Sequence, residues 1–297
     1  MFRLSGALIF LTACSDYQYG VPEQAIDEWL VRGNVDIVVY GDTSDSMTDT
    51  LATLTQNIVR FVSRLEDSDT DWHLIAVTGP DGCAQGGVLD NETPGWEDAF
   101  TRGITTKPAE DLVDEWGLHN AAQALAQSVD GGCNEGFLRD DAHLHVVFIS
   151  DEDDNSPGFD GSDPEYWRTY VDAITASKAD SSKVHLSAVG GPEPVGCSFA
   201  DFARGYWDAV DATGGDFLSI CDDWVNQLDA LADSSVVRDT FKLKEEANPD
   251  TVRVFVDGAE RIGGWTFREK AREVKFVSDP PYAGQQVEVR YTVAVGT

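Results

Sequence analysis

Two spacings of apolar residues alternate along most of the chain, one typical of buried strands and the other of amphipathic helices. Residues 35–40 are almost continuously apolar, and residues 51–65 place their apolar side chains on one helical face. Further strand-like runs lie at 72–78, 143–150, 183–189 and 216–220, and further helical stretches at 118–129, 164–177, 199–212 and 223–232. Strands that alternate with helices predict a Rossmann-like, doubly wound, mostly parallel sheet with helices on both faces.

Beyond residue 236 the pattern changes to short segments in which apolar and polar residues alternate. These segments, at 251–256, 265–267, 273–277 and 287–295, are separated by Gly- and Pro-containing turns. We therefore expect an α/β domain over residues 34–235 and a small antiparallel β module over 236–297. Residues 15–33 are mainly polar and are predicted to be a tether.

The charge of the chain excludes one large class of partner. Among 297 residues, 21 Lys and Arg stand against 53 Asp and Glu, which gives a formal net charge of −32. Nucleic-acid binding requires a clustered positive surface, so no nucleic-acid partner is expected. Divalent cations and basic partners remain compatible with this charge.

The first fourteen residues have the features of a bacterial export signal. One positive residue, Arg3, precedes an apolar run that is too short to span a membrane. The run ends in Leu11-Thr12-Ala13-Cys14, which resembles a lipobox and implies that Cys14 becomes an acylated N-terminus, anchored in a membrane. Ser15 favours the outer membrane of the cell envelope, without indicating which face.

Export also accounts for the remaining four cysteines, an even number suited to an oxidising compartment. Four cysteines allow three pairings. Cys83 follows one predicted strand and Cys133 precedes another, so both lie at one end of the sheet. Cys197 and Cys221 flank the next strand–helix–strand unit. We predict the disulfides Cys83–Cys133 and Cys197–Cys221. A zinc site made from all four is the alternative, but no C-x-x-C spacing supports it.

Oxygen-bearing side chains follow two of the predicted strands. Asp42, Ser44 and Ser46 form a D-x-S-x-S pattern after the first strand, and Asp151 follows the strand at 143–150. The carboxyl ends of parallel strands meet at one rim of a sheet, which is where ligands bind in such folds. One carboxylate and two hydroxyls on alternate residues suit a hard divalent cation.

With these motifs, residues of about 34–235 resemble a von Willebrand factor A-type domain of bacterial lipoproteins. The resemblance implies a metal-ion-dependent adhesion site with Asp42, Ser44, Ser46 and Asp151, most readily holding Mg²⁺, or else Mn²⁺ or Ca²⁺. His119 aligns where the family has a threonine, so the site could hold Mg²⁺ weakly, use Asn120 or a water in place of the threonine, or prefer a softer ion. Asp45 stands where glycine is common and adds charge beside the site. The implied function is binding of a protein partner that offers a carboxylate to the cation.

Several other interpretations fit the same residues. The Asp and Ser side chains could simply cap the first helix, and Glu152, Asp153 and Asp154 could form a solvated loop. The chain could be a metal-free structural subunit of an envelope assembly, or a hydrolase that uses Asp42, Asp151 and His119. No nucleophile elbow, H-E-x-x-H or Walker motif occurs in the sequence, so no enzymatic activity is predicted.

Overall fold

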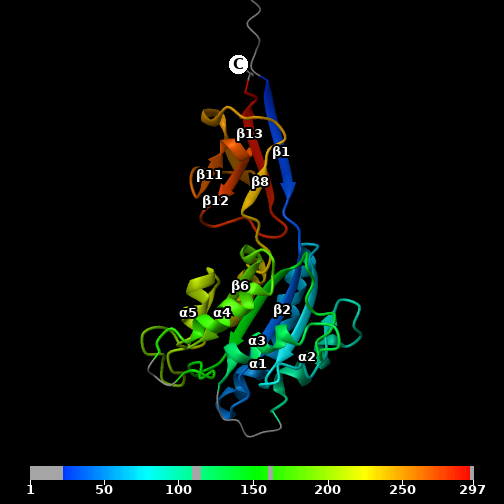
Figure 1. The fold of residues 1–297 in the computed structure, drawn as a ribbon, viewed down its shortest axis with the longest axis vertical. Helices are drawn as coiled ribbons and strands as arrows, with labels where there is room; N and C mark the ends of the chain where they lie inside the picture. Colours follow the sequence, from blue (N-terminus) through cyan, green and yellow to red (C-terminus); the bar gives the residue numbers. More distant parts are fainter. Residues whose placement is uncertain (1–22, 109–114, 160–162, 295–297) are drawn as a thin grey trace, which may run out of the picture.

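A computed structural model describes residues 23–108, 115–159 and 163–294 as two parts arranged along one axis (Figure 1). The larger part is the α/β domain, whose six-stranded sheet has the order β4-β3-β2-β5-β6-β7. All neighbouring strands pair in parallel except β4, which is antiparallel to β3. The predicted Rossmann-like, mostly parallel architecture is therefore confirmed.

The elements of the α/β domain follow one another in the expected alternation. Its strands are β2 (Asn34–Gly41), β3 (Asp71–Val77), β4 (Leu89–Asp90), β5 (His143–Ile149), β6 (Val184–Gly190) and β7 (Phe217–Ser219). Its α-helices are α1 (Thr48–Asp67), α2 (Trp96–Thr105), α3 (Gly117–Ala126), α4 (Trp167–Ala176), α5 (Tyr206–Thr213) and α6 (Leu228–Asp233), with the short 3-10 helices η1 (Asp45–Met47), η2 (Ser181–Lys183) and η3 (Trp224–Gln227).

Two hydrophobic cores lie on the two faces of this sheet. Val35, Ile37 and Val39 of β2 pack with apolar residues of α1, α2 and α6. Val38 and Tyr40 of the same strand pack on the opposite side with residues of α3, α4 and α5. A strand that is buried on both faces needs a nearly continuous apolar sequence, which explains why β2 was recognisable.

Two helices differ from the expectation. Helix α2 was not predicted; it has only ten residues, and Gly103 and Thr105 in its last turn are weak helix formers. Helix α5 begins at Tyr206 instead of near residue 199. Residues 199–205 instead form a loop that pairs Phe202 with Gly191.

The β module consists of two small antiparallel sheets, with the orders β1-β13-β9-β10 and β11-β12-β8. Its strands are β1 (Gln24–Leu30), β8 (Thr240–Lys242), β9 (Arg253–Val256), β10 (Ala259–Arg261), β11 (Trp265–Arg268), β12 (Glu273–Phe276) and β13 (Gln286–Thr292), with the 3-10 helices η4 (Pro249–Thr251) and η5 (Glu269–Ala271). A third core, which includes Phe241, Val274 and Tyr291, lies between the sheets.

The assignment of residues 15–33 to a polar tether is wrong for Gln24–Leu30, which form β1. This strand pairs with β13 along its whole length. Its inward side chains are Ala25, Asp27 and Trp29, while the outward Ile26 is 56% exposed, so the usual apolar-in, polar-out alternation is broken at its centre. Asp27 is buried because it accepts hydrogen bonds from the Tyr291 hydroxyl at 2.8 Å and the Lys244 backbone N–H at 2.9 Å.

Strand β1 makes the α/β domain an insertion in the β module. The chain enters that domain through residues 31–33 and leaves it after α6. Both crossings are hydrogen-bonded to the segment before β13: the Gly284 N–H donates to the Val31 carbonyl at 2.9 Å, and the Ala283 N–H donates to the Val236 carbonyl at 2.8 Å.

Both predicted disulfides are confirmed. Cys83–Cys133 closes a separation of 50 residues and Cys197–Cys221 one of 24. Disulfides persist in oxidising compartments, which indicates an extracellular or envelope location. In the described ranges, no helix combines the length and apolar character required to cross a bilayer.

A buried ionic cluster lies near the amino ends of the central strands. Asp36 in β2 is fully buried and contacts Lys178 Nζ at 2.9 Å and Arg139 Nε at 2.7 Å. The Lys178 side chain is itself only 2% exposed. This cluster joins β2 to the segments after α3 and α4, and it was not foreseen from the sequence.

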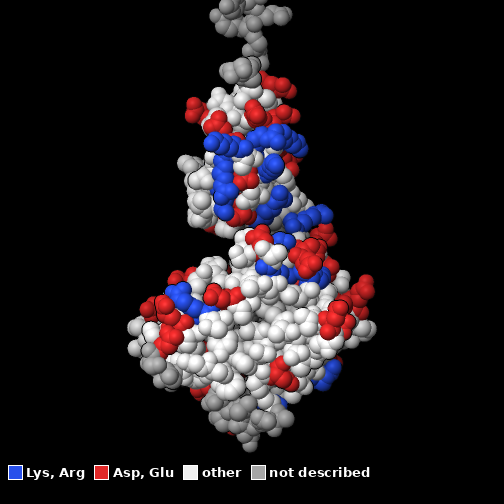
Figure 2. All heavy atoms as spheres, in the orientation of Figure 1, with Lys and Arg blue, Asp and Glu red and all other residues white. Residues whose placement is uncertain are grey.

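Charge is unevenly divided between the two parts. Ten of the 21 Lys and Arg lie in residues 236–297, where ten Asp and Glu also occur. The net negative charge therefore belongs almost wholly to residues 1–235. Figure 2 shows Lys and Arg gathered on the face of the β module where Figure 1 shows β8, β11 and β12.

Candidate cation site

The D-x-S-x-S segment lies where β2 ends, at the rim farthest from the β module (Figure 1). Asp42 is buried and accepts hydrogen bonds from the Ser44 backbone N–H at 2.7 Å and the Ser150 hydroxyl at 2.9 Å. Neither η1 nor α1 has a side-chain cap. The helix-capping interpretation of Asp42, Ser44 and Ser46 is therefore wrong.

These side chains instead face one another and the end of β5. The Ser44 and Ser46 hydroxyl oxygens are 2.9 Å apart, and the Ser46 hydroxyl donates to Asp151 Oδ1 at 3.3 Å. Burial raises the pKa of Asp151, and the negative charge of Asp42 raises it further, whereas the Ser46 bond acts against both. The structure thus brings Asp42, Ser44, Ser46 and Asp151 together, as the sequence predicted.

Glu115, which is not among the site residues predicted from the sequence, brings a further carboxylate to this group. It lies just before α3, and its side chain is close enough to Asp42 and Glu152 for their charges to act on it. Burial, together with these two charges, raises the pKa of Glu115 to about 7. The sequence offers only a weak signal for it, an acidic residue two positions before a helix that starts at the same rim.

No basic side chain balances this group. Among the described residues, none of the carboxylates of Asp42, Glu115, Asp151 and Glu152 has a Lys or Arg partner in an ion pair. The pKa of Glu152 is raised by burial and by the charges of Asp42 and Asp151. Four mutually repelling carboxylates in a partly buried setting favour either protons or a bound cation.

The arrangement is not a cage of charged ligands. Within ranges 23–108, 115–159 and 163–294, no three His, Cys, Asp or Glu side chains are grouped so that they could hold one metal ion. In particular, His119 is not grouped in this way with Asp42 and Asp151. Its ring lies edge-on to Trp116 and Tyr170, with centroids 5.6 and 6.0 Å away.

The other residues considered from the sequence have structural partners. Asp45 is 97% exposed on its side chain and forms an ion pair with Lys107 at 2.7 Å. Asn120 is buried and donates to the Thr78 carbonyl at 3.4 Å, while its Oδ1 has no hydrogen-bond partner. Neither is seen among the contacts of Asp42 or Asp151.

The acidic loop after β5 is not uniformly solvated. Asp154 is fully buried and accepts from the Leu118 N–H at 3.0 Å and the Ser156 hydroxyl at 2.9 Å. It thereby satisfies the first turn of α3, and burial raises its pKa to about 6. The solvated-loop interpretation therefore fails for Asp154.

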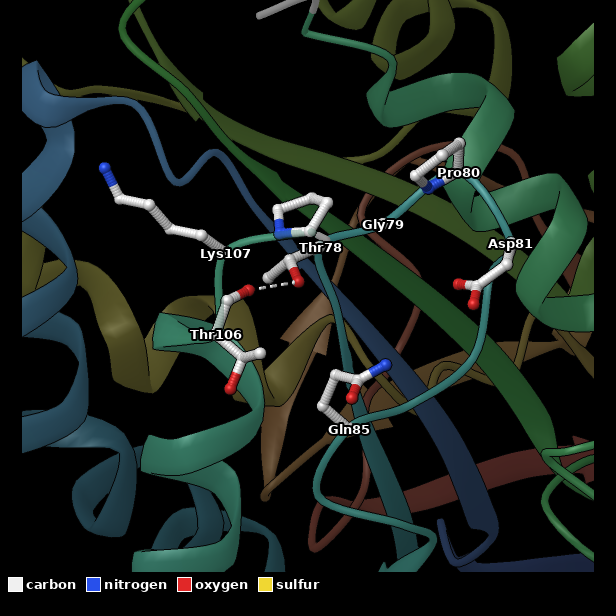
Figure 3. Close-up of a pocket in the computed structure, with 8 residues that line it drawn as sticks. Thr78, Gly79, Pro80, Asp81, Gln85, Thr106 and Lys107 are labelled. Atoms are coloured by element: carbon white, nitrogen blue, oxygen red, sulfur yellow. Dashed lines mark hydrogen bonds between the residues drawn. The ribbon is translucent and has the colours of Figure 1, made fainter. Parts of the chain in front are cut away.

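A cleft of about 480 Å³ opens at the same rim, between the end of β3 and the segment that follows α2 (Figure 3). Its lining includes Thr78, Pro80, Gln85 and Lys107. The Thr78 hydroxyl donates to the Thr106 carbonyl at 2.7 Å and closes one wall.

The raised pKa of Glu115 gives a prediction for stability against pH. Because the folded pKa of about 7 exceeds the ordinary 4.5, the folded chain takes up this proton first. Without divalent cations, the free energy of unfolding contributed by this group should increase as pH falls from about 8 to 5, by up to about 3 kcal/mol. Urea titrations of wild type and Glu115→Gln should diverge over this interval, with the flatter curve for the variant.

The comparison with Glu115→Gln is needed because buried histidines act in the opposite direction. Burial lowers the pKa of His143 to about 4 and of His145 to about 3, so both favour unfolding as pH falls below their ordinary value of 6.5. These contributions cancel in the difference between the two proteins. Parallel curves would contradict the assigned pKa of Glu115.

Comparison with known proteins adds similarities of fold. No family model matches the chain, and no curated protein matches it. Solved structures that resemble it include a von Willebrand factor type A protein from Catenulispora acidiphila, with 16% identity, a TM-score of 0.43, and coverage of 96% of this chain and 68% of that one. The pilus adhesin SpaC from Lactobacillus rhamnosus GG has 11% identity and a TM-score of 0.41, with coverage of 94% of this chain and 44% of that one. Proximal thread matrix protein 1 from the mussel byssus has 15% identity and a TM-score of 0.41, with coverage of 75% of this chain and 51% of that one.

Proposed function

We propose that this chain is an envelope lipoprotein that binds a protein partner through a divalent cation at the rim formed by Asp42, Ser44, Ser46 and Asp151. The main support is the cluster of four carboxylates that have no basic partner among the residues the structure describes, next to two hydroxyls that face each other. Such a cluster is destabilising unless positive charge is added.

The donor set suits a hard cation. Carboxylate and hydroxyl oxygens favour Mg²⁺, with Mn²⁺ or Ca²⁺ as alternatives, over softer transition metals. Asp42, Ser44 and Ser46 would hold the ion, while Asp151 would orient Ser46 and add charge. His119, predicted from the sequence at the threonine position, is left out of this set, and Glu115 and Glu152 are added as acidic neighbours of Asp42. When bound, the ion would supply a coordination position for a carboxylate of the partner.

The anchor is proposed at Cys14, which lies outside the described residues. Two observations support it. The disulfides indicate export, and β1 begins at the end of the β module that is farthest from the rim (Figure 1). An N-terminal membrane anchor would therefore leave the rim accessible to a partner.

Cation binding is tested by thermal unfolding in chelator and in Mg²⁺, Mn²⁺ or Ca²⁺. A cation present at a hundred times its dissociation constant adds about 2.7 kcal/mol, which corresponds to roughly 5–10 °C for a domain of this size. If no ion shifts the midpoint, the cation site is refuted and a metal-free structural subunit becomes the better assignment.

Partner binding is tested by capture from envelope extract, with and without chelator. Two apolar side chains next to the rim give a second readout, because Val195 is 76% and Phe199 60% exposed. Their loop is held by the Cys197–Cys221 disulfide and by a hydrogen bond of 2.8 Å from the Asp201 N–H to the Asp151 carbonyl. Capture should require the cation and should weaken in Phe199→Ser. Turnover of a phosphoester or peptide that is lost in Asp42→Ala would instead identify a hydrolase.

A further inference from the structure

The outer face of the sheet β11-β12-β8 carries basic side chains in register. Along each strand, alternate residues are buried and accessible. Lys242 lies opposite Glu273, Glu273 lies opposite Arg268, and Lys275 lies between Thr240 and Thr266. Three cations thus share this face with one carboxylate.

Three more basic residues lie at the ends of the same strands. We call the whole set the basic face; it consists of Lys242, Lys244, Arg268, Lys270, Arg272 and Lys275. Three members form ion pairs: Arg268 with Glu273 at 2.7 Å, Lys275 with Asp239 at 3.3 Å, and Lys244 with Asp27 at 3.1 Å. Lys242 and Lys270 are exposed, and neither forms an ion pair with any residue that the structure describes.

The basic face stands out because the rest of the chain is so acidic. Residues 1–235 hold 11 Lys and Arg against 43 Asp and Glu. In Figure 2, Lys and Arg gather over the front of the β module, while the same side of the α/β domain is mostly uncharged, with Asp and Glu toward its edges. The basic face is therefore a local attraction for an anionic surface.

We propose that the basic face docks on the phosphate-bearing headgroups of the membrane that anchors the chain. This inference rests on the anchor in the proposed function. From Cys14 to Glu23 there are nine residues, which can span at most about 30 Å, so the β module cannot leave the neighbourhood of the bilayer. An acidic protein partner would have to reach the basic face by diffusion, whereas the tether keeps the membrane close to that face. The membrane is therefore the favoured occupant.

The electrostatics are of the right size for such a contact. Screening limits the attraction to about 8 Å at physiological salt, so the nearest charges dominate over the distant acidic domain. Each Lys or Arg near an anionic leaflet strengthens binding roughly fivefold. A few such residues bind weakly alone but suffice when a tether supplies a high local concentration.

Docking would also set the orientation of the molecule. The basic face lies along the side of the β module, parallel to the long axis in Figure 1, and not at its end. The docked chain would lie along the membrane with the cation rim pointing sideways, at the end opposite the tether.

The test uses the chain from Cys14 onward, in which Cys14 is the single cysteine outside the two disulfides. Coupling Cys14 to maleimide lipid in vesicles fixes the tether whether or not the cell acylates it. Lysine acetylation is then followed by mass spectrometry on phosphatidylcholine vesicles with and without phosphatidylglycerol. Lys242 and Lys270 should react about fivefold or more slowly on the anionic vesicles and recover at high salt.

Lys107, at the rim, is the internal control and should react equally on both vesicles. Lys242→Glu/Lys270→Glu should remove the protection of the remaining face lysines, and Arg102→Glu, an exposed charge reversal on α2, should not. Equal reactivity of the face on both vesicles would overturn the proposal, as would protection that appears only when the chain self-associates. A separate mass measurement of Cys14 from the native envelope tests the anchor, so the two failures are distinguishable.

Discussion

Replacing Asp42 by asparagine is expected to abolish the rise in melting temperature that the proposed cation site predicts for the wild-type protein in divalent cations. Asparagine keeps the acceptor for the Ser44 N–H and a polar contact with Ser150, so the loop should still fold. It removes the one carboxylate that contributes to the raised pKa values of Glu115, Asp151 and Glu152 alike. Roughly 5–10 °C of cation-dependent stabilisation should therefore be lost.

In chelator, the same substitution should not lower the stability of the protein and could raise it. Without a cation, Asp42 repels its acidic neighbours, so Asp42→Asn should be at least as stable as wild type. Asp45→Asn is the matched control, because this carboxylate is nearby in sequence but exposed and paired with Lys107; its cation response should stay near wild type. A full cation response in Asp42→Asn would refute the assignment of Asp42.

Replacing Asp36 by asparagine is expected to lower the free energy of unfolding by about 3–5 kcal/mol, because the buried Lys178 ammonium then lacks its counter-charge. Asp36 accepts from Lys178 Nζ at 2.9 Å and from both the side chain and the backbone of Arg139. Urea denaturation should show the loss as a lower midpoint with an unchanged slope.

Two controls separate burial from simple loss of an ion pair. Asp229→Asn breaks the exposed pair with Arg60, whose side chains are 46% and 42% exposed, and should change stability by no more than about 1 kcal/mol. Asp36→Leu combined with Lys178→Met removes both charges and should recover much of the loss. A small effect of Asp36→Asn would show that Lys178 reaches water or another anion.

The α/β domain was readable from sequence because its strands are buried on both faces and are therefore continuously apolar. Strand β1 was not, since Asp27 lies among its inward residues and the apolar Ile26 lies among its outward ones. The Asp27 carboxylate is satisfied by Tyr291, a partner 264 residues away. A buried polar contact of this range leaves no periodic signal. Residues 24–30 consequently looked like a tether.

The candidate site also contains residues that the sequence predicts and residues that it does not. Asp42, Ser44 and Ser46 were found because one short loop holds them, and Asp151 because it ends the strand beside that loop. Glu115 depends on how the segment before α3 packs against Asp42 and Glu152, which neither spacing nor helical periodicity encodes. Alignment by sequence alone selected His119, whose ring packs on Trp116 instead.

The insertion of the α/β domain after β1 has a mechanical consequence. From the start of β1, the backbone runs through residues 31–33 and along β2 directly to Asp42. Tension between an N-terminal anchor and a ligand held at Asp42 would therefore be carried by covalent bonds of one nearly straight path, without crossing a noncovalent joint. Under such tension the seven residue pairs of the β1–β13 ladder would lie beside the loaded path, so the load would pass along β1 without having to break them.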